Sequence, residues 1–143
     1  MEVVDECASM LSNHEVYTLL TDIQKGQHGH RKPNKNQQLL ATVSYSTLKY
    51  LEKTPCCQQS PDIIHKFMVA IESFSLTKAE KLQLLNHRPT TAVEIQLIVE
   101  ESEERLTEEQ IDKLLGIIAS SLPSDPEEEV VEGSGAEYMQ VAE

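Results

Sequence analysis

The feature that most constrains this chain is a helix-start signal that recurs along its length. In a capping box, a Ser or Thr side chain accepts a hydrogen bond from the third following backbone N–H, and a Glu or Gln at that third position bonds back. Four pairs with this spacing stand at the start of an apolar segment, namely Ser12 and Glu15, Thr77 and Glu80, Thr91 and Glu94, and Thr107 and Gln110. Proline closes the apolar segments at Pro55, Pro89 and Pro123, because its ring disfavours continuation of a helix. We therefore expect short helices joined by tight turns.

Apolar residues follow these starts at helical spacing. The first stripe comprises Val16, Leu19, Leu20 and Ile23, and a short second helix is predicted over residues 46–53. Ser60 with Pro61 predicts a third start, followed by a broad stripe from Ile63 to Phe74. The later starts carry apolar sets at 82–85, at 93–98 (Val93, Ile95, Leu97 and Ile98) and at 111–122. No strand signal competes, so the predicted fold class is all-α, a small bundle of short helices.

Composition divides the chain into three parts. Residues 1–55 form an N-terminal segment that contains a predicted mobile loop at 26–38, where large apolar side chains are lacking. Residues 56–122 form the helical domain. Residues 123–143 are acidic and poor in apolar side chains, and they are predicted to be a disordered tail because they cannot offset the entropy of ordering.

Charge and cysteine content exclude several classes of protein. The net charge of −12 argues against a freestanding basic nucleic-acid binder. Seven acids and no base lie in residues 124–143, while residues 1–66 are balanced. Three cysteines are few and odd in number, which is typical of a reducing compartment. The acidic N-terminus and the short apolar runs predict neither a signal peptide nor a membrane span, so we expect a soluble intracellular protein.

Candidate catalytic and metal-ligating residues are few. Cys56 and Cys57 are adjacent, whereas chelating cysteines are usually separated by two to four residues. His28 and His30 flank a glycine without a carboxylate or cysteine that would complete a metal site. The acidic run at 100–109 is interpreted as a solvated segment between helices, because catalytic carboxylates need an apolar pocket or a specific partner. The sequence therefore predicts no enzyme, no cofactor and no metal.

Three segments carry a family resemblance. They are residues 11–20 (LSNHEVYTLL), Thr47–Pro55 (TLKYLEKTP) and, above all, Leu76–Ile111, which begins LTKAEKLQLLNHRP. These segments resemble the family of the smaller stalk subunit of RNA polymerase III, also named the calcitonin gene-related peptide receptor component family. The resemblance extends from Leu11 to Leu122.

The resemblance implies a fold and a role. It implies a bundle like the helicase-and-RNaseD C-terminal (HRDC-like) domain and an N-terminal segment that wraps the larger stalk subunit, which has an oligonucleotide-binding barrel. It also implies a nuclear heterodimer on the polymerase core that supports engagement of the initiation factor TFIIIB and transcription of transfer RNA, 5S ribosomal RNA and other small RNAs. The partner would contact most of the nucleic acid, in agreement with the acidic charge of this chain.

Two sets of residues are predicted to matter for this role. The partner-binding set is Leu11, Val16, Leu19, Leu20 and Ile23, with packing on the chain's own helices as the alternative. The second set is the turn Asn86, His87, Arg88 and Pro89. One interpretation is a helix stop in which Asn86 or His87 caps the last carbonyls. The other is a bidentate pair between Arg88 and a carboxylate of the bundle or of a neighbouring subunit.

Two other function classes stay open from the sequence. The first is an accessory protein of a G-protein-coupled peptide receptor, the receptor for calcitonin gene-related peptide, in the cytoplasm and at the membrane periphery. The second is a helical domain that binds nucleic acid directly. Salt-dependent membrane fractionation and a gel shift would distinguish these from the polymerase subunit.

Overall fold

The fold is known from a computed structural model, which describes residues 2–26 and 35–124. The helices are α1 (Asn13–Gly26), α2 (Lys35–Leu51), the 3-10 helix η1 (Pro55–Gln58), α3 (Pro61–Ala70), α4 (Lys78–His87), α5 (Ala92–Ile98), α6 (Ser102–Arg105) and α7 (Glu108–Ser121). Within the described ranges there is no strand, and the all-α prediction is confirmed. The finer resemblance to an HRDC-like domain and the three-part domain division stay predictions.

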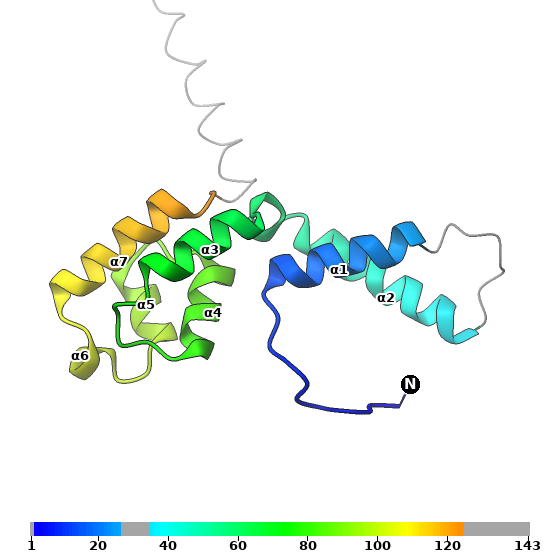
Figure 1. The fold of residues 1–143 in the computed structure, drawn as a ribbon, viewed down its shortest axis with the longest axis horizontal. Coiled ribbons are helices and arrows are strands. Elements are labelled where there is room, and N and C mark those ends of the chain that lie inside the picture. Colours follow the sequence, from blue (N-terminus) through cyan, green and yellow to red (C-terminus); the bar gives the residue numbers. More distant parts are fainter. Residues whose placement is uncertain (1, 27–34, 125–143) are drawn as a thin grey trace, which may run out of the picture.

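The helices form two groups. Helices α3 to α7 make a compact bundle, and α1 and α2 run side by side as an arm that extends from one end of it (Figure 1). We call residues 13–26 and 35–51 the α1–α2 arm. Helix η1 contacts α1, α2 and α4, and thus lies at the junction between the arm and the bundle.

The hydrophobic core lies within the bundle. Its centre includes Phe67 of α3, Leu84 of α4, Ile95 of α5 and Leu114 of α7, each with no solvent-accessible surface. Partly buried residues from Ile63 to Ile117 pack around this centre. The apolar stripes of α3 and α7 therefore bury against each other and against α4 and α5, as their helical spacing predicts.

The predicted capping boxes are present. Ser12 N donates to Glu15 Oε2 at 2.6 Å, and Glu15 N donates to Ser12 Oγ at 3.2 Å. The same reciprocal bonds occur in the boxes that begin at Thr77, Thr91 and Thr107. Each box satisfies backbone donors that the first turn of a helix leaves without an intrahelical partner, and so fixes where the helix begins.

The predicted boundaries of the second helix are wrong. Helix α2 begins at Lys35, not at Ser46, so the last residues of the predicted 26–38 loop are helical. The physical reason is that Leu40 continues the inner side of the helix N-terminal to the buried Leu48 and Leu51, while Leu39 and Ala41 are good helix formers. Residues 27–34 of the predicted loop, and the predicted tail from residue 125 onward, lie outside the described residues.

The glutamates of the acidic run at 100–109 are exposed, as the interpretation as a solvated segment expects, but the short helix within the run was not predicted. Ser102 to Arg105 form the single-turn helix α6, which follows Glu101 in the left-handed region at φ 49°. A non-glycine residue in this conformation is uncommon and needs support from its surroundings. The residues on both sides of Glu101 are held on α4, because Glu100 N donates to Glu80 Oε1 at 3.3 Å and Arg105 forms an ion pair with Glu80.

The Glu80–Arg105 pair joins α4 to α6. Arg105 donates from Nη1 to Glu80 Oε1 at 2.7 Å and from Nη2 to Glu80 Oε2 at 2.8 Å. The same guanidinium donates to the carbonyls of Ser75 at 2.7 Å and Glu100 at 2.9 Å. Glu80 is buried, and the Arg105 hydrogen bonds lower its carboxyl pKa to about 2. One bidentate pair therefore holds three segments of the bundle together.

The depressed pKa of Glu80 predicts acid sensitivity. Its pKa is about 2 in the fold against an ordinary value of 4.5, so its contribution to stability is present above about pH 4.5 and is lost as the pH falls toward 2. In chemical denaturation between pH 6 and pH 2.5, the wild-type chain should therefore lose more unfolding free energy than Glu80→Gln. Parallel pH profiles of the two proteins would contradict this prediction.

Candidate functional site

The predicted partner-binding stripe lies on α1, where it is only partly covered. Val16, Leu20 and Ile23 are half-buried, and Leu19 is 50% exposed. No residue of α1 is fully buried, although the helix packs on α2 and η1. Packing within the chain thus covers part of the stripe, as the alternative interpretation expected, and leaves the rest open to solvent.

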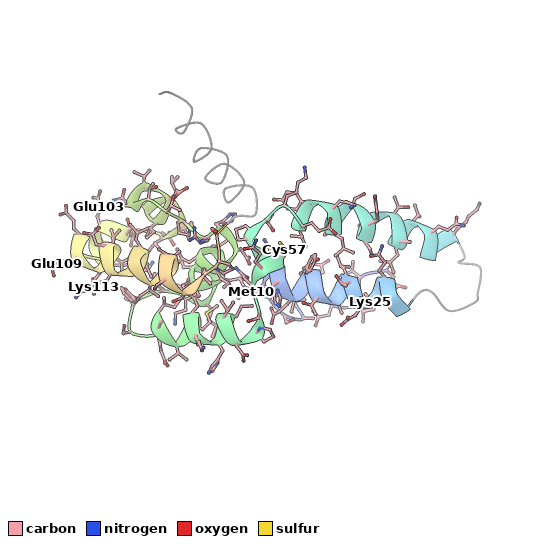
Figure 2. The ribbon with its side chains drawn as sticks, turned by 90° about the horizontal axis from the view of Figure 1, so that it is seen from above. Met10, Lys25, Cys57, Glu103, Glu109 and Lys113 are labelled. Carbon is pink, nitrogen blue, oxygen red and sulfur yellow. The ribbon has the colours of Figure 1, made fainter. Side chains whose placement is uncertain are left out.

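The residues that precede α1 are exposed as well. Leu11, the remaining member of the predicted set, is 43% exposed, and its neighbour Met10 is 62% exposed. Figure 2 shows Met10 at the end of α1 that adjoins the bundle and Lys25 at the far end of the arm. The exposed apolar residues therefore occur both at the root of the arm and along α1.

Helix α2 carries a second apolar stripe that the sequence analysis missed. Leu39, Val43 and Tyr50 are all more than 60% exposed. Their spacing of four and seven residues places them on one side of the helix, away from the side that buries Leu48 and Leu51. Two packed helices without a further layer cannot bury two faces of α2, and exposed apolar surface of this kind marks interaction sites. The arm is therefore the candidate protein-binding site.

A set of long-range hydrogen bonds attaches the arm to the bundle. Asn13 N, at the start of α1, donates to Asn86 Oδ1 at 2.9 Å. His14 Nδ1 lies 2.9 Å from the carbonyl oxygen of Cys56, and Gln59 Nε2 donates to the Leu85 carbonyl at 3.1 Å. These bonds connect the root of α1 and η1 with the C-terminal end of α4, and so they orient the arm.

The turn 86–89 ends α4, as predicted, but with different partners. Asn86 accepts from α1, and the backbone N–H of Arg88, at φ 46°, donates to the Leu84 carbonyl instead. Arg88 Nε donates to the carbonyl oxygen of Leu122 at 3.2 Å rather than to a carboxylate of the bundle. His87 is exposed and Pro89 is buried. A pair between Arg88 and a carboxylate of a neighbouring subunit stays a prediction.

Removing the Asn86 acceptor should loosen the arm. Asn86→Ala leaves the N–H of Asn13 without its partner, and the loss of a helix-capping acceptor typically costs about 1 kcal/mol. We expect faster amide hydrogen exchange in α1 with little change in α7. Gln83→Ala, an exposed site on α4, is the control and should leave the exchange of both helices unchanged. Equal exchange in the two variants would contradict the proposed role of Asn86.

Candidate metal ligands and reactive nucleophiles are few among the described residues. No group of three or more His, Cys, Asp or Glu side chains is placed there to hold a metal ion. Burial raises the pKa of the Cys56 thiol, which favours the unreactive protonated form. Among the helices of residues 2–26 and 35–124, none combines the length and the apolar character needed to cross a bilayer.

Comparison with known proteins assigns the arm and the bundle to one family. Residues 10–122 match the family described as RNA polymerase Rpb4, and this range begins just before α1 and ends just after α7. The chain belongs to the RNA polymerase Rpb4 family. Because the match covers both the arm and the bundle, the exposed arm is part of the Rpb4-family fold rather than an addition to it.

Three relatives of this Rpb4-family chain carry related names. It is 31% identical to the DNA-directed RNA polymerase III subunit rpc9 of Schizosaccharomyces pombe over 129 residues, which cover 86% of this chain and all of the relative. The subunit RPC9 of Saccharomyces cerevisiae is 27% identical, with 83% and 98% coverage, and rpc9 of Dictyostelium discoideum is 26% identical, with 71% and 77%. These findings support the polymerase part of the predicted resemblance, and the receptor-component name receives no support from them.

Proposed function

We propose that this chain is the smaller stalk subunit of RNA polymerase III. The observation that carries the proposal is the similarity, over 71% to 86% of this chain, to three proteins named as subunits of that polymerase, together with membership of the Rpb4 family. The role is that of a non-catalytic protein in the nucleus. Neither the peptide-receptor role nor direct nucleic-acid binding is supported by a comparable observation.

The α1–α2 arm is the part of the chain that we propose binds the larger stalk subunit. Its exposed Leu19, Leu39, Val43 and Tyr50, together with Leu11 just before α1, supply an apolar surface of the kind that becomes the centre of an interface. The barrel of the partner would supply the missing layer over the arm. The resulting heterodimer would join the polymerase core and support engagement of TFIIIB at promoters of small-RNA genes.

The electrostatics of the chain support a division of labour within the heterodimer. A net charge of −12 repels phosphates, whereas nucleic-acid affinity rises with the number of Lys and Arg side chains that neutralise phosphates. We therefore assign the RNA and DNA contacts to the partner. A gel shift with this chain alone should give no salt-dependent complex.

The experiment that tests the proposed function is affinity purification of the tagged full-length chain from nuclear extract. We expect stoichiometric recovery of the larger stalk subunit and the polymerase III core, identified by mass spectrometry, and no enrichment of the subunits specific to polymerases I and II. Recovery of a membrane receptor complex without polymerase subunits would overturn the proposal.

A further prediction concerns dye binding by the chain without its partner. Because the arm exposes apolar side chains on both helices, the isolated chain should bind an environment-sensitive dye such as ANS, and addition of the larger stalk subunit should reduce the dye fluorescence severalfold. The summed fluorescence of the two proteins, each measured alone with the dye, is the reference for the mixture. Unchanged fluorescence on heterodimer formation would contradict the proposed burial of the arm.

A further inference from the structure

Helix α5 of the bundle has apolar side chains on two opposite sides. Ile95 and Val99 are buried in the core, whereas Val93 is 64% exposed and Leu97 is 83% exposed. Val93 and Leu97 are four residues apart, so they lie one turn apart on the same side of the helix. They belong to the bundle and not to the arm, since α5 is one of the bundle helices (Figure 1). The proposed heterodimer contact at the arm therefore leaves these two residues unexplained.

The exposed side of α5 borders a shallow hollow. Its volume is about 290 Å³, and its walls are His87, Pro89, Glu94, Leu97 and Ile98. Pro89 is buried, and Ile98 is partly buried against the core, so these two walls are fixed by the bundle. A hollow of this size next to Leu97 accommodates one large side chain from another protein segment.

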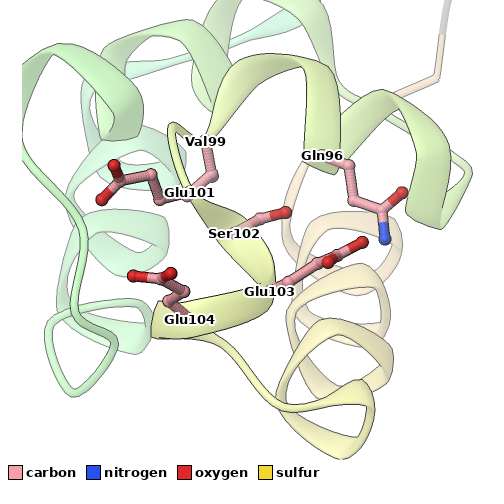
Figure 3. A pocket seen from close by; sticks show the side chains of 6 residues that line it. All are labelled: Gln96, Val99, Glu101, Ser102, Glu103 and Glu104. Atoms are coloured by element: carbon pink, nitrogen blue, oxygen red, sulfur yellow. The ribbon is translucent and has the colours of Figure 1, made fainter.

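Carboxylates flank this apolar side. Glu94 lines the hollow itself, where it accepts hydrogen bonds from the N–H groups of Thr90 and Thr91. Beyond α5, a second hollow is lined by Gln96, Val99, Glu101, Ser102, Glu103 and Glu104. Figure 3 shows the Glu103 side chain directed toward Gln96 of α5. Arg105, the base within this stretch, is paired with Glu80 and also interacts electrostatically with Glu101. Glu103, on the side of Gln96, is therefore the carboxylate of this stretch that counts toward the border of α5.

We propose that α5 and its acidic border form a second docking surface, for a protein segment with one large apolar side chain flanked by Lys or Arg. We define this α5 surface as Val93, Leu97, Glu94 and Glu103. The apolar side chain would enter the hollow beside Leu97, and the basic residues would face the carboxylates. Charge complementarity of this kind selects a partner and accelerates its association.

The charge of the α5 surface discriminates among possible occupants. Residues 124–143 of this chain carry seven acids and no base, so they are electrostatically disfavoured there. A second copy of the chain would bring the same carboxylates against each other, and nucleic acid would bring phosphates. A basic and apolar segment of another protein satisfies both the hollow and the charges.

The first test locates the occupant in cells. The full-length chain is produced with the photoreactive residue benzoylphenylalanine in place of Leu97, and with the same residue in place of exposed Lys113 of α7 as the control. We expect a crosslink specific to position 97, whose partner peptide contains an apolar residue with at least two nearby Lys or Arg. No crosslink above the control, a crosslink to nucleic acid, or a crosslink to an acidic peptide would overturn the proposal.

The second test measures binding of the crosslinked segment as a labelled synthetic peptide by fluorescence anisotropy. Leu97→Ser should weaken binding at least tenfold, and Glu103→Gln should reduce the salt dependence of binding. Leu19→Ser, on the arm, is the matched control and should bind the peptide as the wild type does. That control separates this surface from the proposed heterodimer contact. Binding unaffected by Leu97→Ser, with an unchanged melting temperature, would overturn the proposal.

Discussion

Replacing Leu19 with aspartate is expected to abolish capture of the larger stalk subunit by this chain. Leu19 is half-exposed on a helix that has no fully buried residue, so its remaining surface is available to the partner. At the interface, the change removes apolar burial and places a carboxylate in an apolar contact, which costs several kcal/mol without a compensating partner. We expect the dissociation constant to rise at least about a hundredfold, measured by calorimetry with the purified larger subunit.

The control for this prediction is Thr18→Asp. Thr18 is the neighbouring exposed residue on α1 and lies on a different side of the helix from Val16 and Leu20. The substitution Thr18→Asp therefore adds the same charge outside the stripe. Both variants should melt at nearly the wild-type temperature, because neither side chain is buried in the isolated chain. If Leu19→Asp binds the larger subunit with wild-type affinity, Leu19 does not belong to the interface.

Helix starts were the most predictable part of this fold, because a capping box depends on residues only three positions apart. Ser12 with Glu15 and Thr77 with Glu80 form in the structure the bonds that their spacing predicted. Helix ends at proline were predictable for the same local reason. The apolar stripes of α3 and α7 likewise predicted which sides of those helices enter the core.

Contacts between distant residues were not predictable from the sequence. Asn86 accepts from Asn13, 73 residues away, and Arg105 pairs with Glu80, 25 residues away. A separation of this length in the sequence does not indicate which residues will be in contact in the fold. The start of α2 was missed for a different reason, because the polar residues before Leu39 contain no large apolar side chain and so resemble a loop.

The candidate site was predictable only in part. The sequence indicated α1 as the partner-binding helix, and the structure leaves Leu11 and Leu19 exposed there. The stripe on α2 was missed because the predicted second helix began only at Ser46, so Leu39 and Val43 were not placed on the same helix as Tyr50. On α5, Val93 and Leu97 were grouped with Ile95 and Ile98 as one apolar set, although the helical period separates the two pairs. A hydrophobic pattern does not reveal which apolar side lacks a neighbour.

Replacing Glu80 with glutamine is expected to destabilise the bundle by about 2–3 kcal/mol, since it leaves the Arg105 guanidinium without its carboxylate. For a domain of this size, that loss corresponds to a fall of roughly 10 °C in melting temperature. Glutamine still accepts the capping bond from Thr77 N, so helix α4 should begin at the same residue. Thermal unfolding followed by circular dichroism measures the change.

Glu94→Gln is the matched control, because Glu94 occupies the same position of its capping box but is exposed and its hydrogen bonds come from threonines. Its melting temperature should fall far less than that of Glu80→Gln. A double-mutant cycle then isolates the ion pair: once Arg105→Gln has removed the guanidinium, Glu80→Gln should add little further loss. If the two losses add fully, Glu80 stabilises the bundle by a route other than Arg105. Because the pair joins α4 to α6, its loss should raise amide hydrogen exchange in residues 102–105 before it affects α7.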